Sequence, residues 1–170
     1  DRNTLVVFTS DNGPWTVFKE QGGSSGILHA GKGTTWEGGM RVPTVFWLPE
    51  KISPGIINQI GSAMDLFHTF SKLVGVPIPN DRIIDSYDLS PTLFKNQKSY
   101  RDFIFYYRGT QLYALRLGEF KAHFITQGEY GEFGEKIIHD PPLLYNLNHD
   151  PSEKYNIIDK HPEIIEKIKA

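Results

Sequence analysis

Short apolar runs alternate with turn-forming segments through the first hundred residues, in the pattern of an α/β protein. Residues 4–8 and 42–48 are apolar and β-branched, and each run ends in a turn signal, so we expect two strands buried on both faces of a sheet. Residues 62–74 carry apolar side chains at helical spacing before a glycine and a proline, which predicts a helix. A second helix is expected to begin within residues 88–91, at a Ser-Pro pair.

After residue 102 the pattern changes to short aromatic-rich runs separated by turn residues. This spacing predicts an antiparallel meander with strands at residues 103–107, 113–116, 120–124 and 143–147. We expect the aromatic run 103–107 to be core. Residues 161–170 place isoleucines on one face, which predicts a closing amphipathic helix. The change in pattern predicts a boundary near Asn96, between a first part of residues 1–96 and a second part of residues 97–170.

The composition narrows the class of protein. The chain has 170 residues, of which 39% are hydrophobic and 22% charged, so it is long and apolar enough to bury a core. Its 18 Lys and Arg against 20 Asp and Glu argue against a nucleic-acid partner, because nucleic-acid-binding domains carry a basic excess. No apolar run approaches the roughly 18 residues that a membrane span needs. The absence of cysteine excludes a disulfide, a thiolate metal site and a cysteine nucleophile within these residues.

The turn after the first predicted strand holds the first candidate site. Asp11 and Asn12 offer a carboxylate and an amide oxygen, the hard donors that Ca²⁺ or Mg²⁺ prefers. They follow a strand at the edge where ligands of open α/β sheets bind. An equally good interpretation is that the pair only makes an Asx-type turn before Gly13 and Pro14. The residues alone leave both interpretations open.

The glycine-rich stretch 21–39 holds the second candidate, Lys32, and is predicted to be a binding loop rather than a long helix. The sequence around Lys32 nearly completes a phosphate-loop pattern, but Gly33 stands where Ser or Thr should bind Mg²⁺. A nucleotide site is therefore disfavoured. A lysine among glycines still suits an anion, since free backbone N–H groups and an ammonium can both reach it. The alternative is an exposed loop lysine.

The other polar residues are expected to serve structure. The six histidines include no pair at the spacing of helical metal ligands, so each is predicted to be structural or exposed. Asp65 and Glu37 are expected to make caps or ion pairs rather than to catalyse. The polar, glycine-spaced segment 127–135 is either a plain connector or the rim of a cleft.

Several motifs occur together in one order. They are Phe8-Thr9-Ser10-Asp11-Asn12-Gly13-Pro14, Gly31-Lys32-Gly33-Thr34-Thr35-Trp36-Glu37-Gly38-Gly39-Met40-Arg41-Val42-Pro43, Asp65-Leu66, Asp88-Leu89-Ser90-Pro91, Lys121-Ala122-His123-Phe124 and Pro141-Pro142-Leu143-Leu144-Tyr145-Asn146-Leu147. This set resembles the type I sulfatases, and its later members resemble the arylsulfatase A and N-acetylgalactosamine-6-sulfatase branch. The resemblance is collinear and covers nearly the whole chain.

The resemblance implies a fold and an activity. The fold would be α/β: the C-terminal part of an alkaline-phosphatase-like sulfatase domain in residues 1–96, then a small antiparallel sheet with a C-terminal helix in residues 97–170. The activity would be hydrolysis of sulfate monoesters, on a small aryl sulfate or a sulfated glycan. Carried over by position, Asp11 and Asn12 would ligate Ca²⁺ or Mg²⁺, and Lys32 would contact the sulfate. A dication and an ammonium together would neutralise the oxygens of the ester.

The nucleophile of that family is a formylglycine made from Cys or Ser in a Cys/Ser-x-Pro-x-Arg motif, and this sequence contains no such motif. We therefore expect the chain to be the C-terminal portion of a sulfatase, partnered by the rest of the catalytic domain. Alone it is expected to be inactive and to bind Ca²⁺ weakly. Two alternatives stay open: a phosphatase or phosphomutase of the same superfamily, and a non-catalytic C-terminal interaction module.

The resemblance also implies an exported protein, in a periplasmic, secreted or lysosome-like setting. The composition is rich in Ile and Lys, lacks cysteine and contains no Asn-x-Ser/Thr sequon, which favours a bacterial source.

Overall fold

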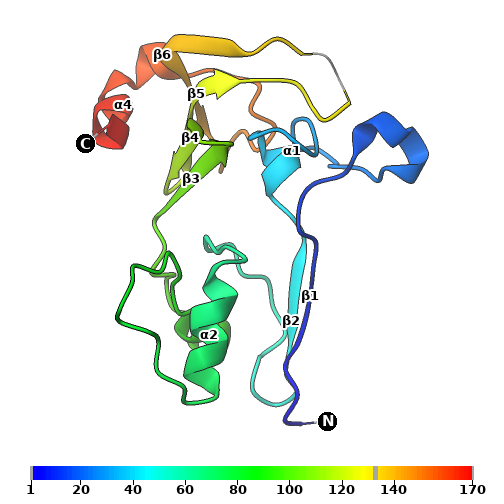
Figure 1. The fold of residues 1–170 in the computed structure, drawn as a ribbon, viewed down its shortest axis with the longest axis vertical. Helices are drawn as coiled ribbons and strands as arrows, with labels where there is room; N and C mark the ends of the chain where they lie inside the picture. Colours follow the sequence, from blue (N-terminus) through cyan, green and yellow to red (C-terminus); the bar gives the residue numbers. More distant parts are fainter. Residues whose placement is uncertain (1, 132–133, 170) are drawn as a thin grey trace. The chain divides into compact units, whose positions relative to one another are not determined.

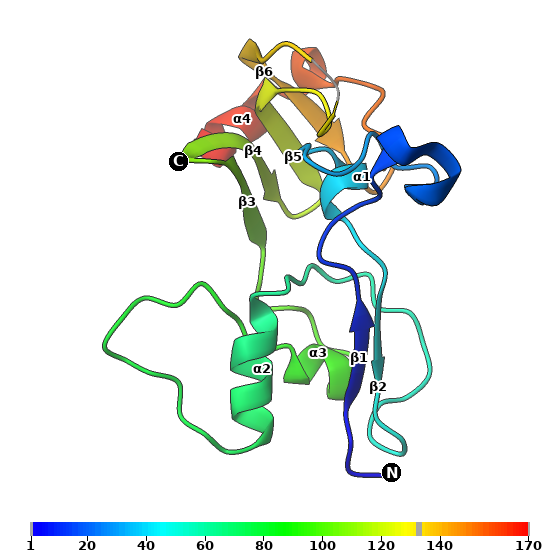
Figure 2. The same ribbon diagram turned by 45° about the vertical axis from the view of Figure 1, so that its right-hand side comes forward.

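A computed structural model describes residues 2–131 and 134–169 of the chain. Figures 1 and 2 show its elements coloured along the sequence. Within these residues no helix is long and apolar enough to cross a membrane.

The chain folds into two units, each assembled from two separate stretches of sequence. The first unit joins the segment ending at Thr9 with Thr44–Asp102. The second joins Ser10–Pro43 with the residues that follow Asp102. The predicted change of pattern after residue 102 therefore coincides with the start of the longer stretch of the second unit.

The first unit contains an antiparallel two-stranded ribbon. Strand β1 (Val6–Thr9) pairs with β2 (Thr44–Trp47), so both predicted strands are present. The expectation that they are buried on both faces is wrong for the described chain, because Phe8 is 71% and Trp47 51% exposed. The physical reason is that neither strand has a second neighbour among the described residues, and the ribbon leaves its apolar side chains uncovered.

Two helices complete the first unit, and both were predicted from the sequence. Helix α2 (Asp65–Leu73) begins with a carboxylate that is fully buried. Helix α3 (Ser90–Lys95) carries Pro91 in its first turn, where the missing N–H of proline removes no helical hydrogen bond. It ends at Asn96, whose left-handed φ of 51° is the usual way for a helix to stop.

The second unit is built on a four-stranded antiparallel sheet, which confirms the predicted meander. Its strands follow one another in the order β3 (Phe103–Arg108), β4 (Gln111–Leu117), β5 (Phe120–Thr126) and β6 (Ile137–Asn146). The first two connections are two-residue turns that contain Gly109 and Gly118. These glycines have φ angles of 60° and 58°, which the tight hairpin turn requires.

One face of this sheet carries the apolar core. Helix α4 (Pro162–Lys169), which the sequence predicted, packs there together with the short 3₁₀ helix η2 (Ile158–Lys160). The buried members of the core are Leu115, Ala122, Leu144, Ile158, Ile165 and Ile168. Because successive side chains of a strand point to opposite faces, the strand residues on either side of each core residue point to the opposite face of the sheet.

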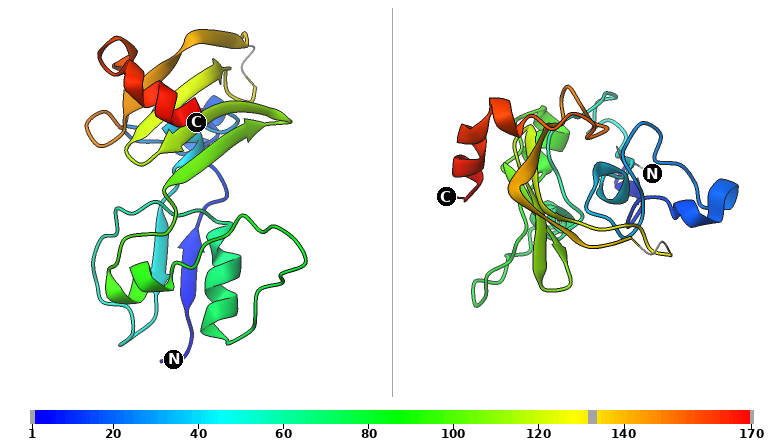
Figure 3. Two further views of the ribbon diagram at one scale, coloured as in Figure 1. Left: turned by 90° about the vertical axis from the view of Figure 1, so that its left-hand side faces the viewer. Right: turned by 90° about the horizontal axis from the view of Figure 1, so that it is seen from above.

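The other face of the sheet is covered by Ser10–Pro43, so that the sheet lies between α4 and this segment (Figure 3). The segment contains the 3₁₀ helix η1 (Thr16–Gln21), the single-turn helix α1 (Glu37–Met40) and turns, in agreement with the predicted glycine-rich loop. The side chains that meet it from β5 are Lys121 and His123, both fully buried. A buried polar layer therefore lies opposite the apolar core.

The aromatic run 103–107 is core only in part. Tyr106 is buried, but Phe105 is 45% and Tyr107 56% exposed. The run forms β3 at the edge of the sheet, where alternate side chains point away from the interior. The expectation that the whole run is buried is therefore wrong.

Candidate functional site

The predicted metal ligands lie in a turn that begins the second unit. Asp11 is exposed and Asn12 is half-buried. The Ser10 hydroxyl donates to the Asn12 carbonyl oxygen across 2.8 Å, which closes the turn. The next backbone N–H, that of Gly13, donates to the carbonyl oxygen of Gly39 at 2.9 Å. The turn is thus fixed to the end of helix α1.

Glycine is required where this turn meets α1. A Cβ atom on Gly13 would stand 1.8 Å from the Gly38 carbonyl oxygen, and one on Gly38 would stand 2.1 Å from the Ala30 carbonyl oxygen. Gly38 also donates its N–H to the His29 carbonyl oxygen at 2.8 Å. Three backbone segments therefore approach one another more closely than any side chain permits.

Lys32 lies in the loop that precedes α1, and its backbone is held from two sides. Its N–H donates to the Pro14 carbonyl oxygen at 2.8 Å, and its carbonyl oxygen accepts the Tyr130 N–H at 3.1 Å. The following Gly33 has a φ of 91°, a conformation that favours glycine. The ammonium group lies 5.2 Å from the centroid of the Trp15 ring, in a cation–π arrangement.

The structure therefore brings the three predicted residues, Asp11, Asn12 and Lys32, into one unit. Pro14, which holds the Lys32 backbone, stands two residues after Asn12 in the same turn. The carboxylate and amide of the turn are the hard oxygen donors that Ca²⁺ or Mg²⁺ takes, although Ca²⁺ needs about six to eight of them. In the part of the chain that the structure describes, no group of three or more His, Asp or Glu side chains converges as a complete metal site.

A buried ionic cluster lies directly behind the Lys32 loop. The Glu37 cluster consists of Glu37, Lys121, His123 and Glu153, and all four side chains are almost completely buried. The Lys121 ammonium lies 2.9 Å from Oε1 of Glu37 and 3.2 Å from Oε1 of Glu153. The same Glu153 oxygen is 2.7 Å from Nε2 of His123. The other Glu153 oxygen accepts the backbone N–H of Glu37 at 2.6 Å, at the start of α1.

The charge states of the cluster follow from its burial. Burial lowers the pKa of His123 to about 4, so this imidazole is neutral and donates its Nε2–H to Glu153. Burial alone would raise the pKa of Glu153, but the His123 hydrogen bond and the Lys121 charge outweigh it and lower that pKa. Two carboxylates thus share one buried ammonium. Arg116 adds a second positive charge at 3.8 Å from Oε2 of Glu37.

The ring of Trp36 fills the space between the Lys32 loop and the sheet. It stacks on His29 with ring centroids 4.4 Å apart and an interplanar angle of 4°, and its centroid lies 4.1 Å from that of His123. Tyr145 of β6 approaches it edge-on at 5.8 Å. Trp36 is only partly buried, whereas Glu37 after it is almost completely buried.

The segment 127–135 contributes to an open pocket of about 400 Å³. Gln127, Glu129 and Glu135 line it from this segment, and His29 and Trp36 line it from the opposite side. Residues 132 and 133 of the predicted segment lie outside the described residues. The alternative that this segment rims a depression is the better description of its described residues.

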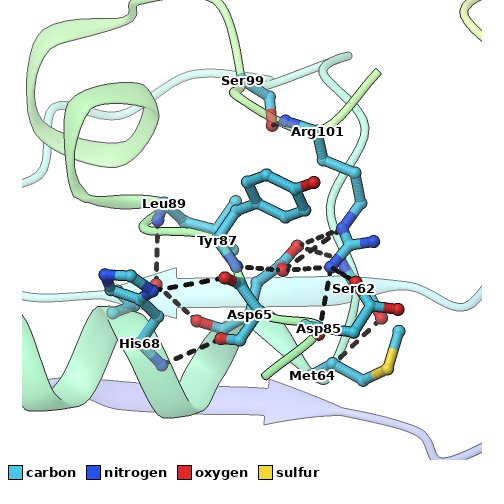
Figure 4. Close-up of polar contacts among 11 residues, drawn as sticks. Ser62, Met64, Asp65, His68, Asp85, Tyr87, Leu89, Ser99 and Arg101 are labelled. Atoms are coloured by element: carbon cyan, nitrogen blue, oxygen red, sulfur yellow. Dashed lines mark hydrogen bonds and ion pairs between the residues drawn. The ribbon is translucent and has the colours of Figure 1, made fainter. Parts of the chain in front are cut away.

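A second buried ion pair holds the first unit together and is separate from the residues above. Asp65 and Arg101 are both almost fully buried, and their side chains meet at 2.7 Å and 3.0 Å through two nitrogens of the guanidinium group. The Asp65 carboxylate also accepts the N–H groups of Ser62 and Tyr87, at 2.9 Å and 2.8 Å (Figure 4). The predicted structural role of Asp65 is confirmed, as is the ion pair predicted for Glu37.

The sequence predicted only a structural or exposed place for His123 and no ion pair for Lys121, His123 or Glu153. One signal was available, because Lys121 and His123 alternate with apolar residues within a short predicted strand. A charged and a titratable residue at positions i and i+2 share one face, which indicates a polar surface against that face. Nothing in the sequence indicated that Glu153, thirty residues later, would complete it.

Comparisons with known proteins point to one family over most of the chain. Residues 1–76 match a family model described as sulfatase, and residues 99–170 match one described as the C-terminal region of aryl-sulfatase. Arylsulfatase A of Homo sapiens is 41% identical over 98% of this chain and 36% of its own length. N-acetylgalactosamine-6-sulfatase of Canis lupus familiaris is 42% identical over 90% of this chain and 33% of its own.

Solved structures agree with this result. The PsFucS1 sulfatase from Pseudoalteromonas sp. superposes with a TM-score of 0.83 at 32% identity, over 91% of this chain and 33% of its own. A Bacteroides thetaiotaomicron sulfatase from a study of glycosaminoglycan metabolism gives a TM-score of 0.80 at 29% identity, over 99% of this chain and 38% of its own.

Two facts qualify the sequence expectations. The chain spans about a third of the length of the relatives it matches. The matched proteins come from animals as well as bacteria, so the bacterial source that composition favoured is not supported.

The expected fold is confirmed by the sulfatase structures and by the antiparallel sheet with its C-terminal helix. With two family models matched in order and close relatives along nearly its whole length, this chain belongs to the sulfatase family.

Proposed function

We propose that this chain is the C-terminal portion of a sulfatase that hydrolyses sulfate monoesters, and that it supplies one side of the active site. The observation that carries this proposal is the backbone connection between the two candidate motifs. The Lys32 N–H donates to the Pro14 carbonyl oxygen and the Gly13 N–H to that of Gly39, so backbone hydrogen bonds hold the Asp11-Asn12 turn and the Lys32 loop together. A turn with oxygen donors, hydrogen-bonded to the loop that carries an ammonium, suits an anionic ester held by a cation.

The residues present fit part of a divalent metal site. Asp11 and Asn12 would supply two oxygen ligands to Ca²⁺ or Mg²⁺, and the remaining ligands would come from outside this chain. Such a cation supplies Lewis-acid stabilisation of negative charge on ester oxygens. Lys32 would bind and orient the sulfate through its ammonium, which the neighbouring Trp15 ring holds in place. The formylglycine nucleophile would likewise come from outside these residues.

The rest of the catalytic domain is the partner that the first unit lacks. Phe8, Val45 and Trp47 on the β1–β2 ribbon are each more than half exposed, although strands with this apolar pattern are normally covered on both faces. We propose that the remainder of the sulfatase domain covers them. In the same scheme residues 1–96 close the catalytic domain and residues 97–170 form a small C-terminal subdomain.

The substrate class follows from the relatives rather than from a pocket in this chain. Matched proteins are named as an arylsulfatase, as an N-acetylgalactosamine-6-sulfatase and as a protein crystallised in complex with k-i-k-neocarrahexaose. We propose an aryl sulfate or a sulfated sugar as substrate, with Gln127 and Glu129 at the rim that selects it. No nucleic-acid partner is proposed, and an exported setting is proposed by family membership.

The test compares the full-length protein that contains this chain with the 170-residue chain alone. Full-length protein should release p-nitrophenol from p-nitrophenyl sulfate, Lys32→Ala and Asp11→Ala should each lower turnover, and the isolated chain should release none. Chelation with EDTA should abolish turnover, and Ca²⁺ or Mg²⁺ should restore it. Preference for p-nitrophenyl phosphate over the sulfate would favour the phosphatase alternative. Turnover of either ester by the isolated chain would refute the division of the active site proposed here.

A further inference from the structure

The ionic triad within the Glu37 cluster has no part in the proposed chemistry, yet it lies at the base of the loop that carries Lys32. Glu37, Lys121 and Glu153 come from helix α1, strand β5 and the loop after β6, and they meet in a region that solvent does not reach. We propose that this triad is a positioning device that sets the place of Lys32 and of the Asp11-Asn12 turn. The proposal rests on the function proposed above.

Stability alone is a poor reason for such a triad. Removing charges from water costs several kcal/mol per ion, and replacement of a buried ion pair by apolar residues is often neutral or stabilising. Its particular advantage is that each partner tolerates only one arrangement. In this cluster Glu153 uses one oxygen for Lys121 and His123 and the other for the Glu37 backbone N–H. A shift of α1 along the sheet would break contacts at both oxygens together.

The triad is connected to the Lys32 loop by short backbone bonds. Gly38, the residue after Glu37, donates its N–H to the His29 carbonyl oxygen at 2.8 Å. A Cβ atom on Gly39 would come within 2.6 Å of the carbonyl oxygens of both Gly31 and Thr34. The loop from residue 29 to residue 34 therefore lies directly against α1, and Lys32 has to follow α1 if the helix moves.

The same helix holds the metal-binding turn. The Gly39 carbonyl oxygen accepts the Gly13 N–H at 2.9 Å, and Gly13 has no room for a Cβ atom beside Gly38. Asn12 is the residue before Gly13. A displacement of α1 is thus transmitted to Asn12 and to Lys32 at once, and misplacement by about 1 Å can cost about 10²-fold in rate.

Lys121→Met tests the connection because it keeps an unbranched side chain, shorter by the terminal nitrogen, and removes the charge that the two carboxylates share. Arg101→Met is the matched control, since it also breaks a fully buried ion pair but in the unit that does not contain Lys32. We expect both variants of the full-length protein to lose thermal stability. At a temperature where both are folded, only Lys121→Met should lower kcat, by about 10- to 100-fold, and raise the Ca²⁺ concentration needed for half-maximal activity.

A readout that does not depend on activity separates this inference from the proposed function. In hydrogen exchange followed by mass spectrometry, Lys121→Met should speed exchange in peptides containing Gly13 and Lys32, whereas Arg101→Met should not. If wild-type protein hydrolyses no sulfate ester, the proposed function fails. The hydrogen-exchange result still tests whether the triad positions Lys32 and the Asp11-Asn12 turn. If Lys121→Met gives no folded protein, Glu37→Gln replaces it, because Lys121 then keeps its contact with Glu153. Unchanged exchange and kcat, or an equal loss in the Arg101→Met control, would overturn the proposal.

Discussion

The buried, neutral His123 makes a quantitative prediction about acid stability. In the unfolded chain this imidazole takes its ordinary pKa of 6.5, whereas in the folded protein burial lowers the pKa to about 4. Between these values the unfolded state binds more protons than the folded state, so stability falls as the pH is lowered. The loss is about 1.4 kcal/mol per pH unit within that window and reaches about 3 kcal/mol below pH 4.

Other groups that face His123 shape the lower end of this window. Lys121 and Glu37 form an ion pair in the same cluster, and the rings of Trp36 and Tyr145 pack against the imidazole. Glu153 has a lowered pKa in the folded protein, so it contributes stability that is present above its unfolded value of 4.5 and is lost as the pH falls below it. The interval from pH 6.5 to pH 4.5 therefore reports mainly on His123.

The perturbation that isolates this effect is His123→Gln. Glutamine can keep an N–H donor to Glu153 but does not titrate, so the variant should be less stable at neutral pH and show a much flatter pH dependence. The free energy of opening of β4 and β5 is measured by native-state hydrogen exchange from pH 7 to pH 4.5, corrected for the intrinsic pH dependence of exchange. A wild-type profile that stays flat over this interval, or an equal slope in the variant, would refute the assignment of a neutral buried imidazole.

The structure predicts the effects of three further substitutions on activity or stability. Gly13→Ala places a Cβ atom 1.8 Å from a backbone oxygen and should abolish both esterase activity and the native melting transition, whereas Gly55→Ala, which meets no atom within 4 Å, should leave both unchanged. Arg101→Met leaves the Asp65 carboxylate buried without its partner and should lower the free energy of unfolding by about 3–5 kcal/mol in urea denaturation. Ile165→Ala opens a cavity in the core beneath α4 and should cost about 2–5 kcal/mol, while Ile83→Ala, at a fully exposed position, should change stability by less than about 0.5 kcal/mol.

The sequence predicted the elements well because local signals decide them. Glycines that need positive φ mark the hairpins of the meander, and Pro91 marks the start of α3. The period of the apolar positions distinguished α2 and α4 from the strands. These signals act within a few residues, and so they were readable without knowledge of tertiary structure.

The sequence did not predict the contacts between residues that lie far apart along the chain. Arg101 pairs with Asp65 from 36 residues away, and Lys121 pairs with Glu37 from 84 residues away. Periodicity indicates which face of a strand a residue occupies, but it does not indicate what lies against that face. For the same reason Phe105 was expected to be buried, although its strand lies at the edge of the sheet.

The sequence predicted which residues belong to the candidate site, but it did not predict how they are arranged in space. Asp11, Asn12 and Lys32 were chosen for their chemistry and for the family they resemble, and the structure shows how glycine backbones bring the turn and the loop together. Their roles toward metal and sulfate stay predictions. The glycine content of residues 21–39 predicted a loop, but close backbone approach, rather than flexibility, is what the glycines at 38 and 39 permit.

The interleaving of the two units has a consequence for how this region can be divided or exchanged between proteins. The β-sheet after Asp102 is covered on one side by Ser10–Pro43, a segment that precedes it by sixty residues. A C-terminal fragment that begins anywhere between Pro43 and Phe103 lacks this segment. It would expose Lys121, His123 and the neighbouring ring of Tyr145 to water. The C-terminal sheet is therefore not a portable module. Recombination among sulfatases should preserve this region as a block that reaches from the Asp11-Asn12 turn to the last helix.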